Sequence, residues 1–133
     1  MSIKIFEGIP SPYYMGKLLG QEDLKGIERI VFLEKDHIPG KSFHIAVHII
    51  DDSYQHQNAW CYDKLHAHSY DEINILIPFN SRFQYRFEFD GNFKNLYAPV
   101  TIYIPAGIKH RAEPVCGKGV FVCIHLDQII ACS

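Results

Sequence analysis

Short runs in which apolar and polar residues alternate recur along most of the chain. Turns rich in glycine, proline, asparagine and aspartate separate them. Alternation with a period of two is typical of strands that bury one face. The predicted strands are 28–33, 43–50, 72–78, 83–89, 100–104 and 119–126. No run shows the long 3.6-residue apolar stripe of an amphipathic helix, so we expect an all-β chain with little helix.

Two turn signals and an irregular start complete this outline. Asp90-Gly91-Asn92 follows an alternating run and predicts a tight hairpin, and Gly117-Lys118-Gly119 predicts a second turn. Prolines 10 and 12 interrupt any regular element near the beginning. We therefore predict a single domain over residues 1–133, with an N-terminal arm at 1–27 and the strand-rich part at 28–133.

Composition excludes several classes of protein. The chain has 133 residues, 47% of them hydrophobic and 14% aromatic, which is enough to bury a core. Its formal net charge is −2 with mixed signs, so no basic surface for nucleic acid or for a membrane is predicted. No apolar run approaches the roughly 20 residues of a membrane span. The first residues read as neither a signal nor a transit peptide, so we expect a cytoplasmic protein.

The most informative residues form two separate pieces. His66 and His68 are two apart and Glu72 is four further on, so an extended chain brings all three to one face. His110 follows a Pro-x-Gly turn at residues 105–107, which we expect to be a type I turn with glycine at its fourth position. Imidazole and carboxylate groups on one face are suitable ligands for a first-row divalent metal.

These two pieces, His66-x-His68-x-x-x-Glu72 and Pro105-x-Gly107-x-x-His110, resemble the two short motifs of the cupin superfamily. The resemblance spans about residues 60 to 114. It implies a single-domain antiparallel β-barrel, also described as a double-stranded β-helix or jelly-roll-like fold, over residues 28–133. It also implies that the metal lies inside this barrel, and that outer strands pair two copies into a homodimer. A monomer mass in light scattering would count against the homodimer.

Three histidines and a carboxylate can occupy four corners of an octahedron and leave two neighbouring positions open. A closed structural zinc site would more often include cysteine, and the four cysteines of this chain show no Cys-x-x-Cys spacing. We therefore interpret the cysteines as reduced and mostly buried. We expect one divalent metal per chain, with Fe(II) favoured and Mn, Ni, Zn or Cu as alternatives.

Further residues are candidates for contact with a substrate. Asn74 is two residues after Glu72 and should also point into the pocket. The aromatic positions of the run 83–89 should face inward, which would let Tyr85 reach the cavity and leave Arg86 outside. In the reverse orientation, Arg86 becomes a clamp for an anionic substrate. Tyr85, Tyr103 and His48 are alternatives for a general base.

Two questions about histidines stay open at this point. His44 and His48 share one face of their strand, and they either face solvent or line the mouth of the barrel, where His48 would bind substrate. His125, in a late strand, is interpreted as a core histidine with satisfied hydrogen bonds rather than as a ligand.

The resulting functional hypothesis is a metal-dependent enzyme that acts on a small oxygen-rich metabolite, with an Fe(II)-type oxygenase as the first choice. An isomerase or a lyase such as a decarboxylase is the alternative, because one fold supports several reactions. A barrel that holds a small ligand or a metal without turnover is the third hypothesis.

Overall fold

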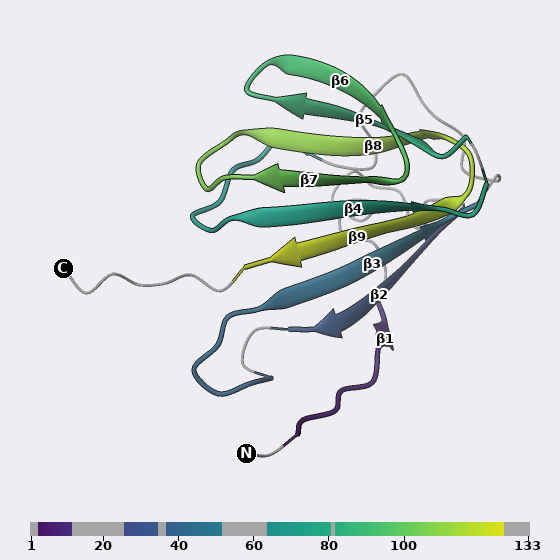
Figure 1. Cartoon of the computed structure of the whole chain (residues 1–133). Helices are drawn as coiled ribbons and strands as arrows, with labels where there is room; N and C mark the ends of the chain where they lie inside the picture. Colours follow the sequence, from purple (N-terminus) through teal and green to yellow (C-terminus); the bar gives the residue numbers. More distant parts are fainter. Residues whose placement is uncertain (1–2, 12–25, 35–36, 52–63, 81, 127–133) are drawn as a thin grey trace.

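The computed structural model describes residues 3–11, 26–34, 37–51, 64–80 and 82–126. Every regular element in these ranges is a β-strand (Figure 1). The strands are β1 (Ile9–Pro10), β2 (Ile27–Leu33), β3 (His44–Ile50), β4 (Glu72–Pro78), β5 (Gln84–Phe89), β6 (Asn92–Tyr97), β7 (Val100–Ile104), β8 (His110–Cys116) and β9 (Gly119–His125).

The strands form two antiparallel sheets. The larger sheet has the order β1-β2-β3-β9-β4-β7, and the smaller sheet has the order β6-β5-β8. In Figure 1 the small sheet lies beyond β7, and β1 and β2 lie at the opposite end of the assembly. An isolated bridge between His66 and His110 joins the first histidine segment to β8. The all-β, antiparallel prediction is confirmed.

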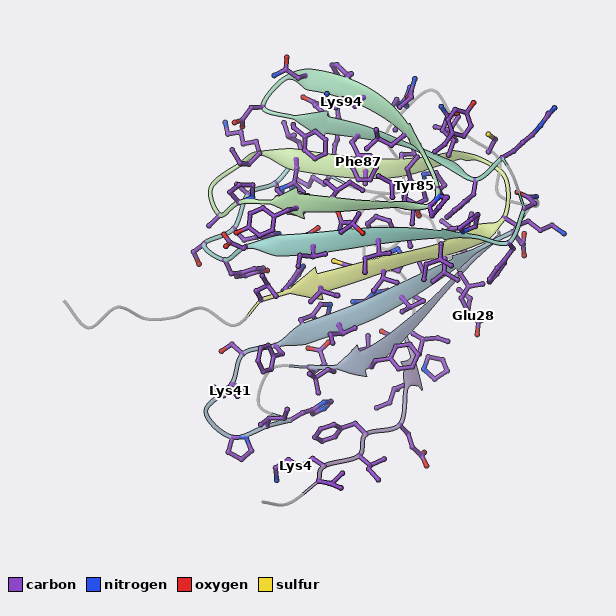
Figure 2. The ribbon with its side chains drawn as sticks, viewed as in Figure 1. Lys4, Glu28, Lys41, Tyr85, Phe87 and Lys94 are labelled. Carbon is purple, nitrogen blue, oxygen red and sulfur yellow. The ribbon has the colours of Figure 1, made fainter. Side chains whose placement is uncertain are left out.

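A core of large apolar side chains fills one part of the space between the sheets. Its central members are the fully buried Phe83, just before β5, and Tyr85 and Phe87 of β5, whose neighbouring rings contact one another and pack with Leu76 of β4 and Phe121 of β9. Figure 2 shows Tyr85 and Phe87 among the tightly packed side chains, whereas Lys4, Lys41 and Lys94 lie at the periphery. The prediction that the aromatic face of β5 points inward is therefore correct.

The main difference from the sequence prediction is that the structure contains additional strands. β4 and β7 have the predicted bounds, while β6 and β8 were not predicted as separate strands. Inside the predicted arm, Ile9 pairs with Val31, and β2 begins at Ile27. Residues 12–25 of that arm lie outside the described residues.

Two sequence predictions, the absence of a membrane span and the formation of a homodimer, concern the outer surface of the molecule. No helix in the described part of the chain is long and apolar enough to cross a membrane. Ile3 and Ile5 of the N-terminal segment are 86% and 87% exposed, which is apolar surface of the kind that a homodimer could bury. The homodimer stays a prediction.

Candidate metal centre

The inward face of the large sheet changes character along its strands. Antiparallel pairing aligns the inward residues of β3, β9 and β4 in rows. The first row is His44, His125 and Glu72, the second is Ala46, Cys123 and Asn74, and the third is His48, Phe121 and Leu76. Each step of two residues keeps the same face, so the polar rows form a continuous floor that ends in the apolar core.

The two predicted motif pieces meet beside the first row. His66 and His110 pair through reciprocal backbone hydrogen bonds of 3.0 and 2.8 Å. The rings of His66, His68 and His110 lie with their centroids 4.4 to 5.2 Å apart. Together with Glu72 these residues place four metal-ligating atoms within 4.8 Å of one another. The structure therefore contains the predicted candidate metal site.

The carboxylate of Asp71 connects the same two pieces on the outer side. It accepts hydrogen bonds from the Ala106 amide, at 2.8 Å, and from the Tyr103 hydroxyl. These bonds lower the pKa of Asp71 and raise that of Tyr103. The turn itself differs from the prediction: Ile108 N donates to Pro105 O, and Gly107 occupies the third position with φ +88°, as a type II turn requires. The turn thus begins one residue later than predicted, at Pro105 instead of residue 104. The positive φ of Gly107, rather than the proline alone, directs the chain toward His110.

The backbone determines which ring nitrogen each histidine presents. Nδ1 of His66 contacts the carbonyl of Lys64, Nδ1 of His110 lies 2.9 Å from the carbonyl of Ile108, and Nδ1 of His68 lies 3.4 Å from the carbonyl of Tyr70. A carbonyl oxygen only accepts, so in each hydrogen bond Nδ1 carries the proton. In a neutral ring Nε2 then presents its lone pair.

These lone pairs converge on Glu72. Its Oε1 lies 3.0 Å from Nε2 of His68 and 3.4 Å from Nε2 of His110, while its Oε2 accepts a 2.8 Å hydrogen bond from the Asn74 amide. Burial opposes the charge of Glu72, but the imidazoles of His110, His125 and His68 around the carboxylate hold its pKa below the usual range. The carboxylate is therefore ionised.

The donor set fits a divalent cation. A neutral imidazole Nε2 and a carboxylate oxygen are both acceptors, so they approach to 3 Å only with positive charge between them. Protonated histidines would supply positive charge, but burial lowers the pKa of His66 and so opposes protonation of the whole cluster. A single metal ion would satisfy all four groups at once, and the Nδ1 contacts to carbonyls orient the rings as they do around bound metals.

A cavity of about 140 Å³ opens beside this cluster. His66, Glu72 and His110 form one wall, Asn74, Cys123 and Phe121 line the floor, and Ala46 and Ala112 are small residues that leave the space open. The remaining lining residues are Arg29, His44, His48 and His125. Asn74 thus lies in the pocket, as predicted from its spacing.

The open question about His44 and His48 has a clear answer, because both line the cavity. His48 is 6% exposed, and its ring lies 5.6 Å from that of Phe121. Burial, with Arg29 and His44 nearby, lowers the pKa of His48 to about 3. His48 is therefore neutral at physiological pH and can donate or accept a hydrogen bond in the cavity.

Two predicted contacts lie elsewhere. Tyr85 does not line the cavity; it is fully buried in the aromatic core, with its ring stacked 4.8 Å from that of Phe121, which separates it from the polar rows. Tyr103 is 56% exposed and bound to Asp71 on the outside, so its strand parity excludes it as a base in the cavity. Arg86 forms a 2.7 Å ion pair with the buried Glu113 on the face opposite the aromatics, as the first alternative predicted.

Sequence reasoning missed three residues of the cavity. Nε2 of His125 lies 3.2 Å from Oε1 of Glu72 and 3.4 Å from Sγ of Cys123, and these three residues form a second possible ligand set. Arg29 reaches the cavity from β2. The sequence carried one signal for Cys123 and His125, because positions 121, 123 and 125 alternate with apolar residues and so share one face of their strand. Only the pairing of β9 with β4 shows that His125 lies opposite Glu72. Cys61 and Cys132 lie outside the described residues.

Comparisons of sequence find no matching family model and no similar curated protein. Comparisons of structure do find similar folds. The Fe(II) form of HppE matches with a TM-score of 0.65 at 7% identity, over 94% of this chain and 61% of that one. A predicted oxalate decarboxylase from Thermotoga maritima matches with a TM-score of 0.58 at 13% identity, over 96% and 100% of the two chains. A cupin superfamily protein from Desulfitobacterium hafniense matches with a TM-score of 0.56 at 12% identity, over 96% and 100%. At such identities the likeness shows a shared fold.

Proposed function

We propose that this chain, which has the fold of the cupin superfamily, is a metal-dependent enzyme that acts on a small oxygen-rich metabolite. Fe(II)-dependent oxygenation is its first candidate reaction. The observation that carries the proposal is the convergence of three imidazole nitrogens and one carboxylate beside a polar cavity. A ligand set that only held the fold together would not need such a cavity at its side.

Within this proposal each side chain has a stated task. His66, His68 and His110 would hold the ion with neutral nitrogens, and Glu72 would reduce the net charge of the site by one. A bound ferrous ion would supply Lewis acidity and an electron source for dioxygen. Asn74 keeps Glu72 oriented through its amide, and His48 offers a neutral imidazole to a polar group of the substrate.

The reaction class is tested by reconstitution. The apoprotein is loaded without oxygen with Fe(II), Mn(II), Ni(II) or Zn(II), and each form is screened with keto acids, catechols, β-diketones and thiols. We expect about one metal per chain and oxygen consumption by the Fe(II) form with at least one substrate class. A His66→Ala/His110→Ala variant is the control, since it should bind no metal and consume no oxygen. Full metal uptake by that variant would contradict the assigned ligands.

A lyase or isomerase is the second candidate. The likeness to a predicted oxalate decarboxylase supports it, because that protein has the same fold over its whole length. The same screen separates the two candidates. Turnover of a substrate by the Mn(II) or Zn(II) form without oxygen, together with an inactive Fe(II) form, would replace the oxygenase proposal. Tight binding of a metabolite with no turnover by any form would instead favour a binding protein.

A further inference from the structure

The cavity has a second end, on β2 and β3, that the metal chemistry does not use. Arg29 pairs in register with His48, and both residues line the cavity. Arg29 shares its inward face with Val31, which is 7% exposed and pairs with Ala46 of the cavity floor. Strand parity therefore places the Arg29 side chain on the face of β2 that lines the cavity.

Arg29 brings a fixed positive charge to this end. A guanidinium has five N–H donors, and Nη1 of Arg29 donates one 3.2 Å hydrogen bond to Oγ of Ser11. Among the described residues, no carboxylate forms an ion pair with it. The negative charge of Glu72 is directed at the histidine cluster, so it does not compensate Arg29.

The two charged ends lie diagonally across the cavity floor. Arg29 and Glu72 are three strand positions apart, which is roughly 14 Å across the sheet. Arg29 lies in the row of His48, and Glu72 lies in the row of His44. These rows are four residues apart, which is roughly 13 Å along the strand. Long side chains and the ion shorten this span, and the small side chain of Ala46 lies between the two ends. A ligand that reaches both ends must be elongated.

We propose that Arg29, with His48 beside it, is an anion-binding subsite, and that the substrate carries an anionic oxygen group at the end opposite its metal-chelating group. This inference rests on the proposed function and deepens it by defining the substrate class. Arg29 would bind a carboxylate or a phosphonate through paired N–H donors, and His48 would complete the contact as a neutral hydrogen-bonding partner.

The test uses ligands that differ only at the distal end. Zn(II)-loaded protein, which cannot undergo redox turnover, is titrated calorimetrically with 2-oxoglutarate, with 2-oxoadipate, and with 5-methyl-2-oxohexanoate, in which methyl groups replace the distal carboxylate oxygens of 2-oxoglutarate. We expect at least one diacid to bind at least tenfold more tightly than 5-methyl-2-oxohexanoate, which keeps the chelating 2-oxo acid but has no distal charge. 2-Oxo-4-phosphonobutyrate then shows whether a phosphonate or a carboxylate is preferred.

Variants locate the effect at Arg29. Arg29→Gln should abolish the preference for the diacid while leaving the affinity for Zn(II) and for 5-methyl-2-oxohexanoate unchanged, and Arg29→Lys should restore part of the preference. Ser11→Ala removes the partner of Arg29 but keeps the charge, so it should retain the preference. Thermal unfolding verifies that each variant is folded.

Two results would overturn the inference without affecting the proposed function. One is equal affinity for the diacids and for 5-methyl-2-oxohexanoate in the wild-type protein, and the other is an undiminished preference in Arg29→Gln. Failure of the wild-type protein to bind Zn(II) at all would instead contradict the proposed function.

Discussion

The two ends of the same three strands differ sharply. At one end, the inward residues of β3, β4 and β9 are histidines, Glu72 and Asn74 around a cavity, and at the other they are Ile50, Leu76 and Phe121 in the core. Hydrogen bonding and strand geometry continue through both ends. The difference therefore comes from side-chain volume and polarity: large apolar groups fill the space at one end, while Ala46 and Ala112 leave it open at the other.

The largest expected effect breaks the apolar end. Phe87 is 1% exposed, so Phe87→Ala removes buried surface and leaves a void, which should lower the free energy of unfolding by about 3–5 kcal/mol. Denaturant titration measures it. Phe79→Ala is the control, because Phe79 is 61% exposed and its loss should change stability by less than about 0.5 kcal/mol. Equal effects of the two changes would refute the assignment of the core.

The next effect concerns the polar end. Glu72→Gln keeps the shape of the side chain but removes the charge that faces the histidines, so the affinity for a divalent metal should fall about 100-fold, or about 2.7 kcal/mol. Competition with a chelator measures it. Glu28→Gln on the exposed face of β2 removes the same charge and should leave the affinity unchanged. A Glu72→Gln protein with wild-type affinity would exclude Glu72 as a ligand.

A third prediction concerns how His48, in the cavity, makes the stability of the protein depend on pH. Because the pKa of His48 is about 3 in the folded protein and about 6.5 when unfolded, the unfolded chain binds one more proton between these values. Stability should therefore fall as pH drops from 6.5 toward 3, by up to about 1.4 kcal/mol per pH unit from this residue. His48→Gln should have a shallower slope. An NMR titration of His48 with a midpoint near 6.5 would contradict the prediction.

The smallest effect concerns the turn that leads to His110. Gly107 has φ +88° and no atom near the position of a Cβ, so Gly107→Ala should cost about 1 kcal/mol of backbone strain without a clash. Gly40 has φ +77° and equal space but lies between β2 and β3. Gly40→Ala should destabilise the fold similarly. Only Gly107→Ala should also weaken metal binding several-fold, and equal metal affinities would show that the turn does not position His110.

Local patterns predicted one end of the strands better than the other. The ligand set follows from the spacing of His66, His68 and Glu72 and from one turn, although only Glu72 of these three lies in a strand. The two motif pieces therefore predicted the candidate site and the fold. Alternation identifies which residues share a face, but not whether that face is the inner one, and His44 and His48 show this. The facing of His125 toward Glu72 depends on pairing between β4 and β9, which start 47 residues apart in sequence (119 against 72).

Tyr85 illustrates the converse error. Its inward direction was predicted correctly from the aromatic face of β5, yet the small sheet places it beside Phe121 in the apolar region and away from the polar rows. Strand parity determines the face toward which a side chain points. The offset between the two sheets determines how far along the barrel that side chain lies. That offset depends on contacts between sheets, which no local pattern encodes.

The pairing of β4 with β9 gives the candidate metal centre the ability to act as a check on correct folding. A slip of one residue would bring Ile124 and Val122 into the cavity, or turn Glu72 and Asn74 toward solvent, because side chains alternate between faces. A misfolded chain in which the slip turns Glu72 outward would lack one of the four candidate ligands and would lose part of the free energy of ion binding. An available ion would therefore selectively retain the correctly registered chains, and quality control would be built into the same residues that are proposed to carry out the chemistry.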